Sequence, residues 1–300
     1  LVHIDNDFYC MVDHQTGTIF YSDKTGKIIH SFSRKGQGPG EYAGLTYVSM
    51  NSEDSTIRVF DQRSEKYIVY DMVGNCLKET LMKDKGLNTI HLLSNDFAVA
   101  KGRTAGNHKL FITDEDLNIR KNLFPLDTTL TEMERLSMIW QLNYCRNRDR
   151  LIVHFANEDT VFSVTKNGAQ PVCIFKKGKY TLPEEEAKKP MEITPSPYIR
   201  SMWLSSVSDY YLITYLFENN IYDEIWSRTD ARIVSRLLCE NGEWGFPFCL
   251  PSGKKVLLNT RLLYIKDNIV ASFIDAATAA EEGIADVGED DNPVLVVMEL

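Results

Sequence analysis

A repeat of about 48 residues is the feature that most restricts the fold of this chain. Residues 9–27 (YCMVDHQTGTIFYSDKTGK) align without a gap on residues 57–75 (IRVFDQRSEKYIVYDMVGN), and apolar runs fall on apolar runs. Three pairs of turn-forming residues also coincide: Asp13 with Asp61, Asp23 with Asp71, and Gly26 with Gly74. Because Asp accepts hydrogen bonds from the N–H groups of a turn and Gly adopts positive φ, each copy predicts three strands joined by a polar turn and a D-x-x-G turn.

Weaker copies follow as pairs of apolar strands: 96–100 with 110–114, 151–155 with 161–165, 211–216 with 224–227, and 255–258 with 268–273. A chain of 300 residues holds about six such units, and strands this apolar suit sheets that are covered on both faces. The pattern predicts an all-β fold, a six-bladed β-propeller of four-stranded antiparallel blades, in one domain over residues 1–300. The expected blades are 1–35, 42–84, 88–125, 138–178, 199–240 and 246–300.

Helix is expected in only two short insertions, near residues 182–189 and 275–282. The first has Pro183 followed by acidic residues, and the second has Asp275 as a cap and Gly283 as a stop. The first insertion lies in the proline-rich segment 176–200, which connects two blades. A connection of this length is either a functional cap or a plain excursion of the chain, and the sequence leaves both open.

The charge balance excludes two classes of partner. With 33 Lys and Arg against 42 Asp and Glu, the net charge is −9, the wrong sign for a protein that binds nucleic acid or an anionic membrane. Nine acidic residues and no basic ones lie in residues 267–300, so this segment accounts for the whole excess. It is either a solvated acidic edge or a site for a cation or a basic partner near residues 289–291. No apolar run reaches the ~18 residues of a membrane span.

The six cysteines are widely spaced and contain no C-x-x-C pair, which argues against a zinc site. Cys10 and Cys173 lie in apolar runs and are expected to be buried free thiols. Cys239 and Cys249 are candidates for a disulfide, although six cysteines allow many pairings.

A glycine-rich turn, Phe32 to Tyr42 (FSRKGQGPGEY), precedes the second D-x-x-G unit. Together with Trp140…Asn143-Tyr144-Cys145 and the segment 291–296 (DNPVLV), it resembles the NHL- and TolB-like six-bladed propellers that gut Gram-negative bacteria export. The resemblance implies a toroidal fold, an extracytoplasmic location in the periplasm or at the cell surface, and a lipid anchor upstream of Leu1. It brings no catalytic residues to this chain.

Familiar catalytic motifs are absent from the sequence. There is no G-x-S-x-G elbow, no H-E-x-x-H motif and no sialidase box, and the glycine-rich turn lacks the Lys-Ser/Thr pair and the following helix of a P-loop. A metal site whose ligands come from several blades would leave no local motif. The alternative to a binding protein is therefore an enzyme of the lactonase or lyase kind, with Ca²⁺ or another divalent cation in the central channel.

The prediction favours a binding or interaction module without a cofactor, monomeric, whose partner is a small molecule, a glycan or another cell-envelope protein. Ligands of propellers bind where loops and outer turns of the blades converge, and aromatic, Arg and carboxylate side chains there suit a sugar. The candidate ligand-binding residues are Arg34, Gln37, Glu41, Tyr42, Arg63, Arg103, His108, Trp140, Tyr144, Tyr198, Arg200 and Trp244.

Overall fold

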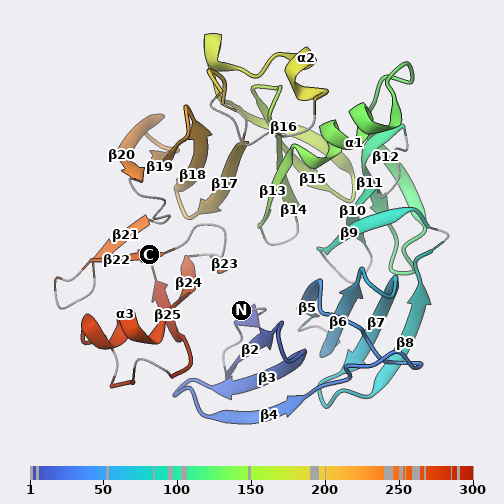
Figure 1. The fold of residues 1–300 in the computed structure, drawn as a ribbon, viewed down its shortest axis with the longest axis vertical. Coiled ribbons are helices and arrows are strands. Elements are labelled where there is room, and N and C mark those ends of the chain that lie inside the picture. Colours follow the sequence, from blue (N-terminus) through green and yellow to red (C-terminus); the bar gives the residue numbers. More distant parts are fainter. Residues whose placement is uncertain are drawn as a thin grey trace. The chain divides into compact units, whose positions relative to one another are not determined.

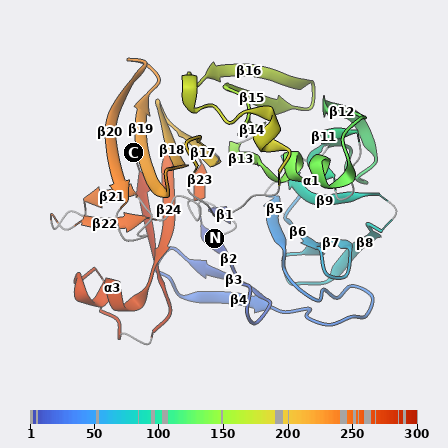
Figure 2. The ribbon, with the colours of Figure 1, turned by 45° about the horizontal axis from the view of Figure 1, so that its top comes forward.

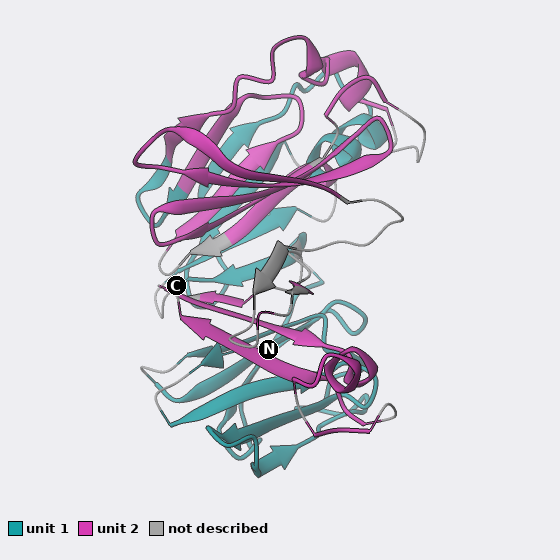
Figure 3. Ribbon diagram, turned by 90° about the vertical axis from the view of Figure 1, so that its left-hand side faces the viewer, with its two compact units in different colours: residues 1–139, 164–169 teal, residues 140–163, 170–300 magenta. Residues whose placement is uncertain are grey.

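The structure is a computed structural model, and the residues that it describes are 3–4, 7–51, 54–83, 85–93, 97–102, 107–147, 150–189, 196–199, 201–239, 246–249, 253, 255–258, 264–266, 268–284, 286–288 and 291–299. Its strands form antiparallel sheets in chain order (Figure 1). The chain divides into two compact units, one of residues 1–139 with 164–169 and the other of residues 140–163 with 170–300 (Figure 3).

The first five sheets are four-stranded blades. Their strands are β1 (His3–Ile4), β2 (Phe8–Asp13), β3 (Thr18–Asp23) and β4 (Ile28–Phe32) in blade 1; β5 (Tyr47–Asn51), β6 (Thr56–Asp61), β7 (Lys66–Asp71) and β8 (Cys76–Leu81) in blade 2; β9 (Leu87–Leu92), β10 (Ala98–Gly102), β11 (His108–Thr113) and β12 (Ile119–Pro125) in blade 3; β13 (Leu142–Asn147), β14 (Arg150–Phe155), β15 (Thr160–Thr165) and β16 (Gly168–Ile174) in blade 4; and β17 (Ser201–Val207), β18 (Tyr210–Phe217), β19 (Asn220–Ser227) and β20 (Arg232–Cys239) in blade 5.

The last part of the chain holds the hairpin of β21 (Phe246–Cys249) and β22 (Lys255–Leu258) and the sheet of β23 (Tyr264–Lys266), β24 (Ile269–Ile274) and β25 (Val294–Glu299). Because β22 lies against β24, we assign all five strands to blade 6. The fold is therefore the six-bladed β-propeller that the repeat predicts.

The D-x-x-G turns of the repeat form as the sequence predicts. The Oδ1 atom of Asp23 accepts hydrogen bonds from the backbone N–H groups of Thr25 at 2.9 Å and Lys27 at 3.0 Å, and Gly26 has a φ of +90°. The hydrogen bond from the Thr25 hydroxyl lowers the pKa of the Asp23 carboxyl. In the second copy Asp71 accepts from Val73 and Asn75 at 3.0 and 2.8 Å, and Gly74 has a φ of +88°.

Burial follows the position of a strand in its blade. All six residues of β6 are buried, whereas four of the six residues of β8, the outer strand, are exposed. The core between blades 1 and 2 contains Cys10, Ile19, Tyr42, Ile57, Ile68 and Tyr70. Burying each such aliphatic side chain stabilises the fold by about 1.5–3 kcal/mol, so the apolar strands of the repeat supply most of the driving force.

Cys10 is buried and free, as predicted, and Cys173 is free and half-buried. The side chains of Cys239 and Cys249 lie outside the described residues.

Helices are few and short (Figure 2). The predicted insertions form α2 (Glu184–Ala187), which follows a 3-10 turn at Gly178–Tyr180, and α3 (Ala276–Glu281), whose cap Asp275 accepts a hydrogen bond from the N–H of Thr278 at 2.8 Å.

A third helix, α1 (Glu132–Trp140), was not predicted. Its signal was present in the sequence as a capping box. The N–H of Thr131 donates to the Glu134 carboxylate at 2.7 Å, and the N–H of Glu134 donates to the Thr131 hydroxyl at 3.4 Å. Met138 and Ile139 of this helix pack into a small core.

Candidate functional site

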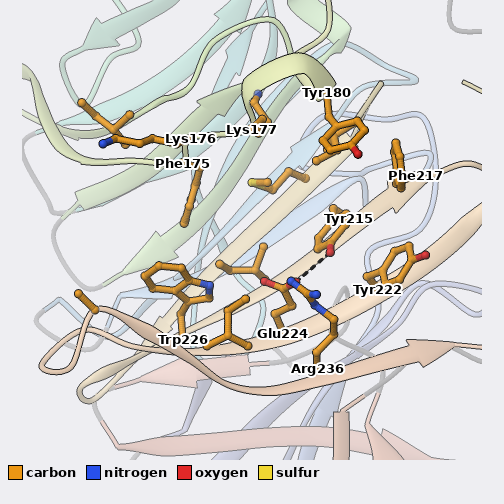
Figure 4. A pocket seen from close by; sticks show the side chains of 16 residues that line it. Phe175, Lys176, Lys177, Tyr180, Tyr215, Phe217, Tyr222, Glu224, Trp226 and Arg236 are labelled. Atoms are coloured by element: carbon orange, nitrogen blue, oxygen red, sulfur yellow. Dashed lines mark hydrogen bonds and ion pairs between the residues drawn. The ribbon is translucent and has the colours of Figure 1, made fainter. Parts of the chain in front are cut away.

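A groove of about 640 Å³ lies on blade 5, in the unit of residues 140–163 and 170–300 (Figure 4). This volume falls in the range of about 300–1,000 Å³ that is usual for ligand pockets. One wall is formed by β18, β19 and β20, and the other by the chain from Ile174 to Tyr180. The residues that line it are Ile174, Phe175, Lys176, Lys177, Tyr180, Ile199, Met202, Ile213, Tyr215, Phe217, Tyr222, Glu224, Trp226, Ala231, Ile233 and Arg236.

Strand alternation explains why these side chains share one face. Tyr222, Glu224 and Trp226 are spaced two apart on β19 and therefore point to the same side of the sheet. The turn into β19 is two residues long, and both of them, Glu218 and Asn219, have positive φ, as in the tight hairpin turns that match the twist of a sheet. The turn thereby fixes the register of the hairpin and the face on which the groove forms.

Cross-strand pairs build the floor of the groove. Tyr215 of β18 lies opposite Tyr222 of β19, and their rings stack with centroids 5.1 Å apart and planes at 13°. Glu224 lies opposite Arg236 of β20. Met202 and Ile213 also line the groove and belong to the buried core between blades 4 and 5, and Trp226 packs against that core. The floor of the groove is therefore continuous with this buried core.

A polar network crosses this aromatic floor. The Oε1 atom of Glu224 accepts hydrogen bonds from Arg236 Nε at 2.6 Å and from the Tyr215 hydroxyl at 2.8 Å (Figure 4). The Glu224 side chain is 7% exposed, whereas that of Arg236 is 54% exposed. The hydrogen bond to Glu224 raises the pKa of Arg236, and burial raises that of Tyr215. Arg236 and Tyr215 therefore both stay protonated, and the charge of the network does not change near neutral pH.

The opposite wall is anchored by Lys177, whose side chain is 2% exposed. Its Nζ donates to the backbone oxygens of Ala156 at 2.9 Å and Glu158 at 2.6 Å and lies 3.6 Å from the Asp159 carboxylate. Burial lowers the pKa of Lys177, and the carboxylate opposes that effect. Lys177 lines the groove, but its ammonium group binds these oxygen atoms and thereby holds the wall in place.

Aromatic residues of the wall meet those of the floor. The Tyr180 ring contacts Phe217 edge to face, with centroids 5.0 Å apart. Lys176, next to Phe175, is exposed, and no interaction of its ammonium group is seen within the described residues. The groove thus combines six aromatic side chains with a buried carboxylate and two accessible basic groups.

The glycine-rich turn holds four of the predicted ligand-binding residues, Arg34, Gln37, Glu41 and Tyr42, and a fifth, Arg63, lies in the turn after β6. The side chains of the glycine-rich turn bind one another and the neighbouring blade. Tyr42 is fully buried; its hydroxyl donates to the Gly17 carbonyl at 2.8 Å and accepts from the N–H of Arg34 at 3.0 Å. Arg34 Nε donates to the Gly74 carbonyl at 2.7 Å, and Glu41 accepts from the N–H of Gly38 at 2.8 Å. Gln37 and Arg63 are exposed.

The other predicted residues are dispersed. Trp140, at the end of α1, is 59% exposed, and Tyr144 of β13 is 37% exposed. His108 lies at the start of β11, and Tyr198 packs against Ala156 and Leu182. Arg103, Arg200 and Trp244 lie outside the described residues. None of the nine predicted residues that are described lines the groove.

The groove residues themselves were not singled out from the sequence, although two signals pointed to them. One is the alternation of Tyr222, Glu224 and Trp226 along a strand, which places a charged side chain between aromatic ones. The other is the long proline-rich connection that begins at residue 176 and supplies the second wall.

Within the described part of the chain, no three His, Cys, Asp or Glu side chains are grouped so that they could hold a metal ion. Among the helices built from described residues, none has the length and apolar character needed to cross a membrane.

Comparison with known proteins gives the family of the chain. A presumed exported protein of Bacteroides fragilis superposes with a TM-score of 0.72 at 14% identity, over 100% of this chain and 90% of that one. A member of the DUF4221 family from Bacteroides vulgatus superposes with a TM-score of 0.56 at 8% identity, over 100% and 92%. Identities this low show a shared fold alone. No curated protein matches the chain. The NHL- or TolB-like relationship stays a prediction. The model of the family described as "Domain of unknown function (DUF4934)" matches residues 1–299, and the chain belongs to that family.

Proposed function

We propose that this protein is an exported, monomeric β-propeller that binds a glycan in the blade 5 groove. The observation that carries the proposal is the lining of the groove, in which aromatic rings surround the hydrogen-bonded network of Tyr215, Glu224 and Arg236. The presumed export of the Bacteroides fragilis protein of like fold supports the extracytoplasmic location.

Sugars need two kinds of contact at once. One face of a pyranose ring carries C–H groups, which pack on the electron-rich face of an aromatic ring. The hydroxyl groups at its rim need donors and acceptors, and bonds to charged partners are the stronger ones. Tyr222 and Trp226 offer rings on the floor, while Oε2 of Glu224 is left over as an acceptor because Oε1 accepts both bonds of the network.

A panel of oligosaccharides, screened by thermal shift and followed by calorimetric titration, tests the proposal. We expect at least one glycan to raise the melting temperature. Trp226→Ala and Tyr222→Ala should weaken its binding by tenfold or more, because each removes a ring from the floor.

Trp140→Ala is the matched control, since Trp140 is an exposed aromatic residue that does not line the groove. Circular dichroism and the melting temperature of each ligand-free variant show whether it is folded. The proposal fails if no glycan of the panel binds, or if Trp140→Ala weakens binding as much as the folded groove variants do.

A further inference from the structure

We propose that the groove selects glycans that bear carboxylate groups, and that Arg236 and Lys176 bind the carboxylates. This inference rests on the proposed function and adds the chemical class of the ligand. Its first support is the sign of the accessible charge. The protein carries a net charge of −9, yet among the described residues that line the groove Glu224 is the one acidic side chain, against Lys176, Lys177 and Arg236.

The charges inside the groove do not all cancel. Glu224 is neutralised by Arg236 at 2.6 Å, and Lys177 is compensated by Asp159 at 3.6 Å. Lys176 remains without an ion-pair partner among the described residues. A groove with excess positive charge on a strongly acidic protein attracts an anionic ligand and repels a cationic one.

Arg236 is oriented in advance for a carboxylate. Its Nε is held by Glu224, which leaves the two Nη groups as donors on a half-exposed side chain. A planar guanidinium presents such donors in the fork geometry that a carboxylate matches with two parallel hydrogen bonds. Since Glu224 is buried and also bonded to Tyr215, the guanidinium loses little further freedom when a ligand binds.

The aromatic surroundings favour an acidic sugar over an acidic peptide. Tyr215 and Tyr222 stack on each other, and aromatic rings that line the groove, such as Trp226, can accept the C–H face of a sugar ring. A glycan with a carboxylate at the rim of a ring can stack and form the charged hydrogen bonds at the same time. Apolar side chains, Ile233 among them, line the groove together with Arg236.

The test compares an oligogalacturonide with its methyl ester by calorimetry on the whole chain. The two ligands offer the same rings and hydroxyls and differ in the carboxylates. We expect the acid to bind at least tenfold more tightly than the ester, as charge-assisted hydrogen bonds require. Arg236→Gln and Lys176→Gln should each reduce this ratio. Arg236→Lys, which keeps a cation beside Glu224 but loses the fork, should reduce it in part.

Arg232→Gln is the matched control, because Arg232 is an exposed cation on the same strand, paired with Asp230, and does not line the groove. It should leave the ratio unchanged. Equal binding of acid and ester, with both weakened by Trp226→Ala, overturns this inference and leaves the proposed function standing. Binding of neither ligand, nor of any other glycan, overturns both. Binding of polyglutamate as tight as that of the acid overturns the assignment to sugars.

Discussion

Gly26 and Gly74 occupy the same position in two D-x-x-G turns, and substitution by alanine separates two contributions to stability. Both have nearly the same left-handed φ, +90° and +88°. An added Cβ at Gly26 would meet nothing within 4 Å, whereas at Gly74 it would lie 2.6 Å from Cγ and Cδ2 of Phe32. Because the Cβ of Phe32 is also only 3.0 Å away, rotation of the ring does not remove the overlap.

The magnitudes follow from these contacts. A left-handed alanine costs roughly 1–2 kcal/mol, and this applies to both variants. Overpacking at Gly74 adds about 1–3 kcal/mol, since Phe32 is 8% exposed and packs against Tyr70 at 5.8 Å between ring centroids. We therefore expect Gly74→Ala to lower the free energy of unfolding by about 1–3 kcal/mol more than Gly26→Ala.

Urea titrations followed by circular dichroism measure the difference, provided that the slope with denaturant stays the same. In a Phe32→Ala background the extra effect of Gly74→Ala should disappear, as a double-mutant cycle would show. Equal effects of the two substitutions in the wild-type background would refute the packing of this turn against Phe32. An extra effect that persists without the Phe32 ring would refute it as well.

Three further substitutions probe buried groups. Leu117 takes the place of the glycine in the turn of blade 3, with a φ of +60°, but its side chain is only 1% exposed. Leu117→Gly should destabilise the protein by about 1–3 kcal/mol, because the packing that is lost outweighs the backbone strain that is relieved. A higher melting temperature of the variant would contradict this. Burial lowers the pKa of His154 to about 3, so the folded protein binds fewer protons than the unfolded chain near pH 5. The free energy of unfolding should therefore fall by about 2 kcal/mol between pH 7 and pH 5 in urea titrations, and His154→Gln should lose this decrease. The same decrease in both proteins would argue against a neutral, buried His154. Tyr42→Phe leaves the Arg34 N–H without its acceptor, while the Gly17 carbonyl still accepts from the Ser33 hydroxyl; the variant should cost about 1–3 kcal/mol in the same assay, whereas no change would show that water replaces the hydroxyl.

Local turn chemistry explains why the blades were predictable. Asp23 and Asp71 each bind the N–H groups of their own turn, and these interactions depend on residues at most four apart. A signal of this range is complete within one repeat and recurs in the next. The capping box of Thr131 and Glu134 is equally local, and the helix that it begins was missed because it falls between repeats.

The interactions that form the groove join residues that lie farther apart in the sequence. Tyr180 meets Phe217, and Arg236 meets Glu224, through pairings that only the folded blades create. The predicted surface around Tyr42 contained the residue types expected of a ligand site, but those side chains hold a turn. Residue type alone does not separate an arginine that binds a carbonyl of its own chain, such as Arg34, from one with donors to spare, such as Arg236.

Hydrogen exchange with and without the tightest-binding glycan of the panel tests most directly whether the blade 5 groove binds the ligand. We predict that the ligand slows exchange in peptides covering residues 174–180 and 211–236, which contain both walls of the groove. Slowed exchange confined to the glycine-rich turn at residues 32–42, with the groove peptides unchanged, would contradict this account.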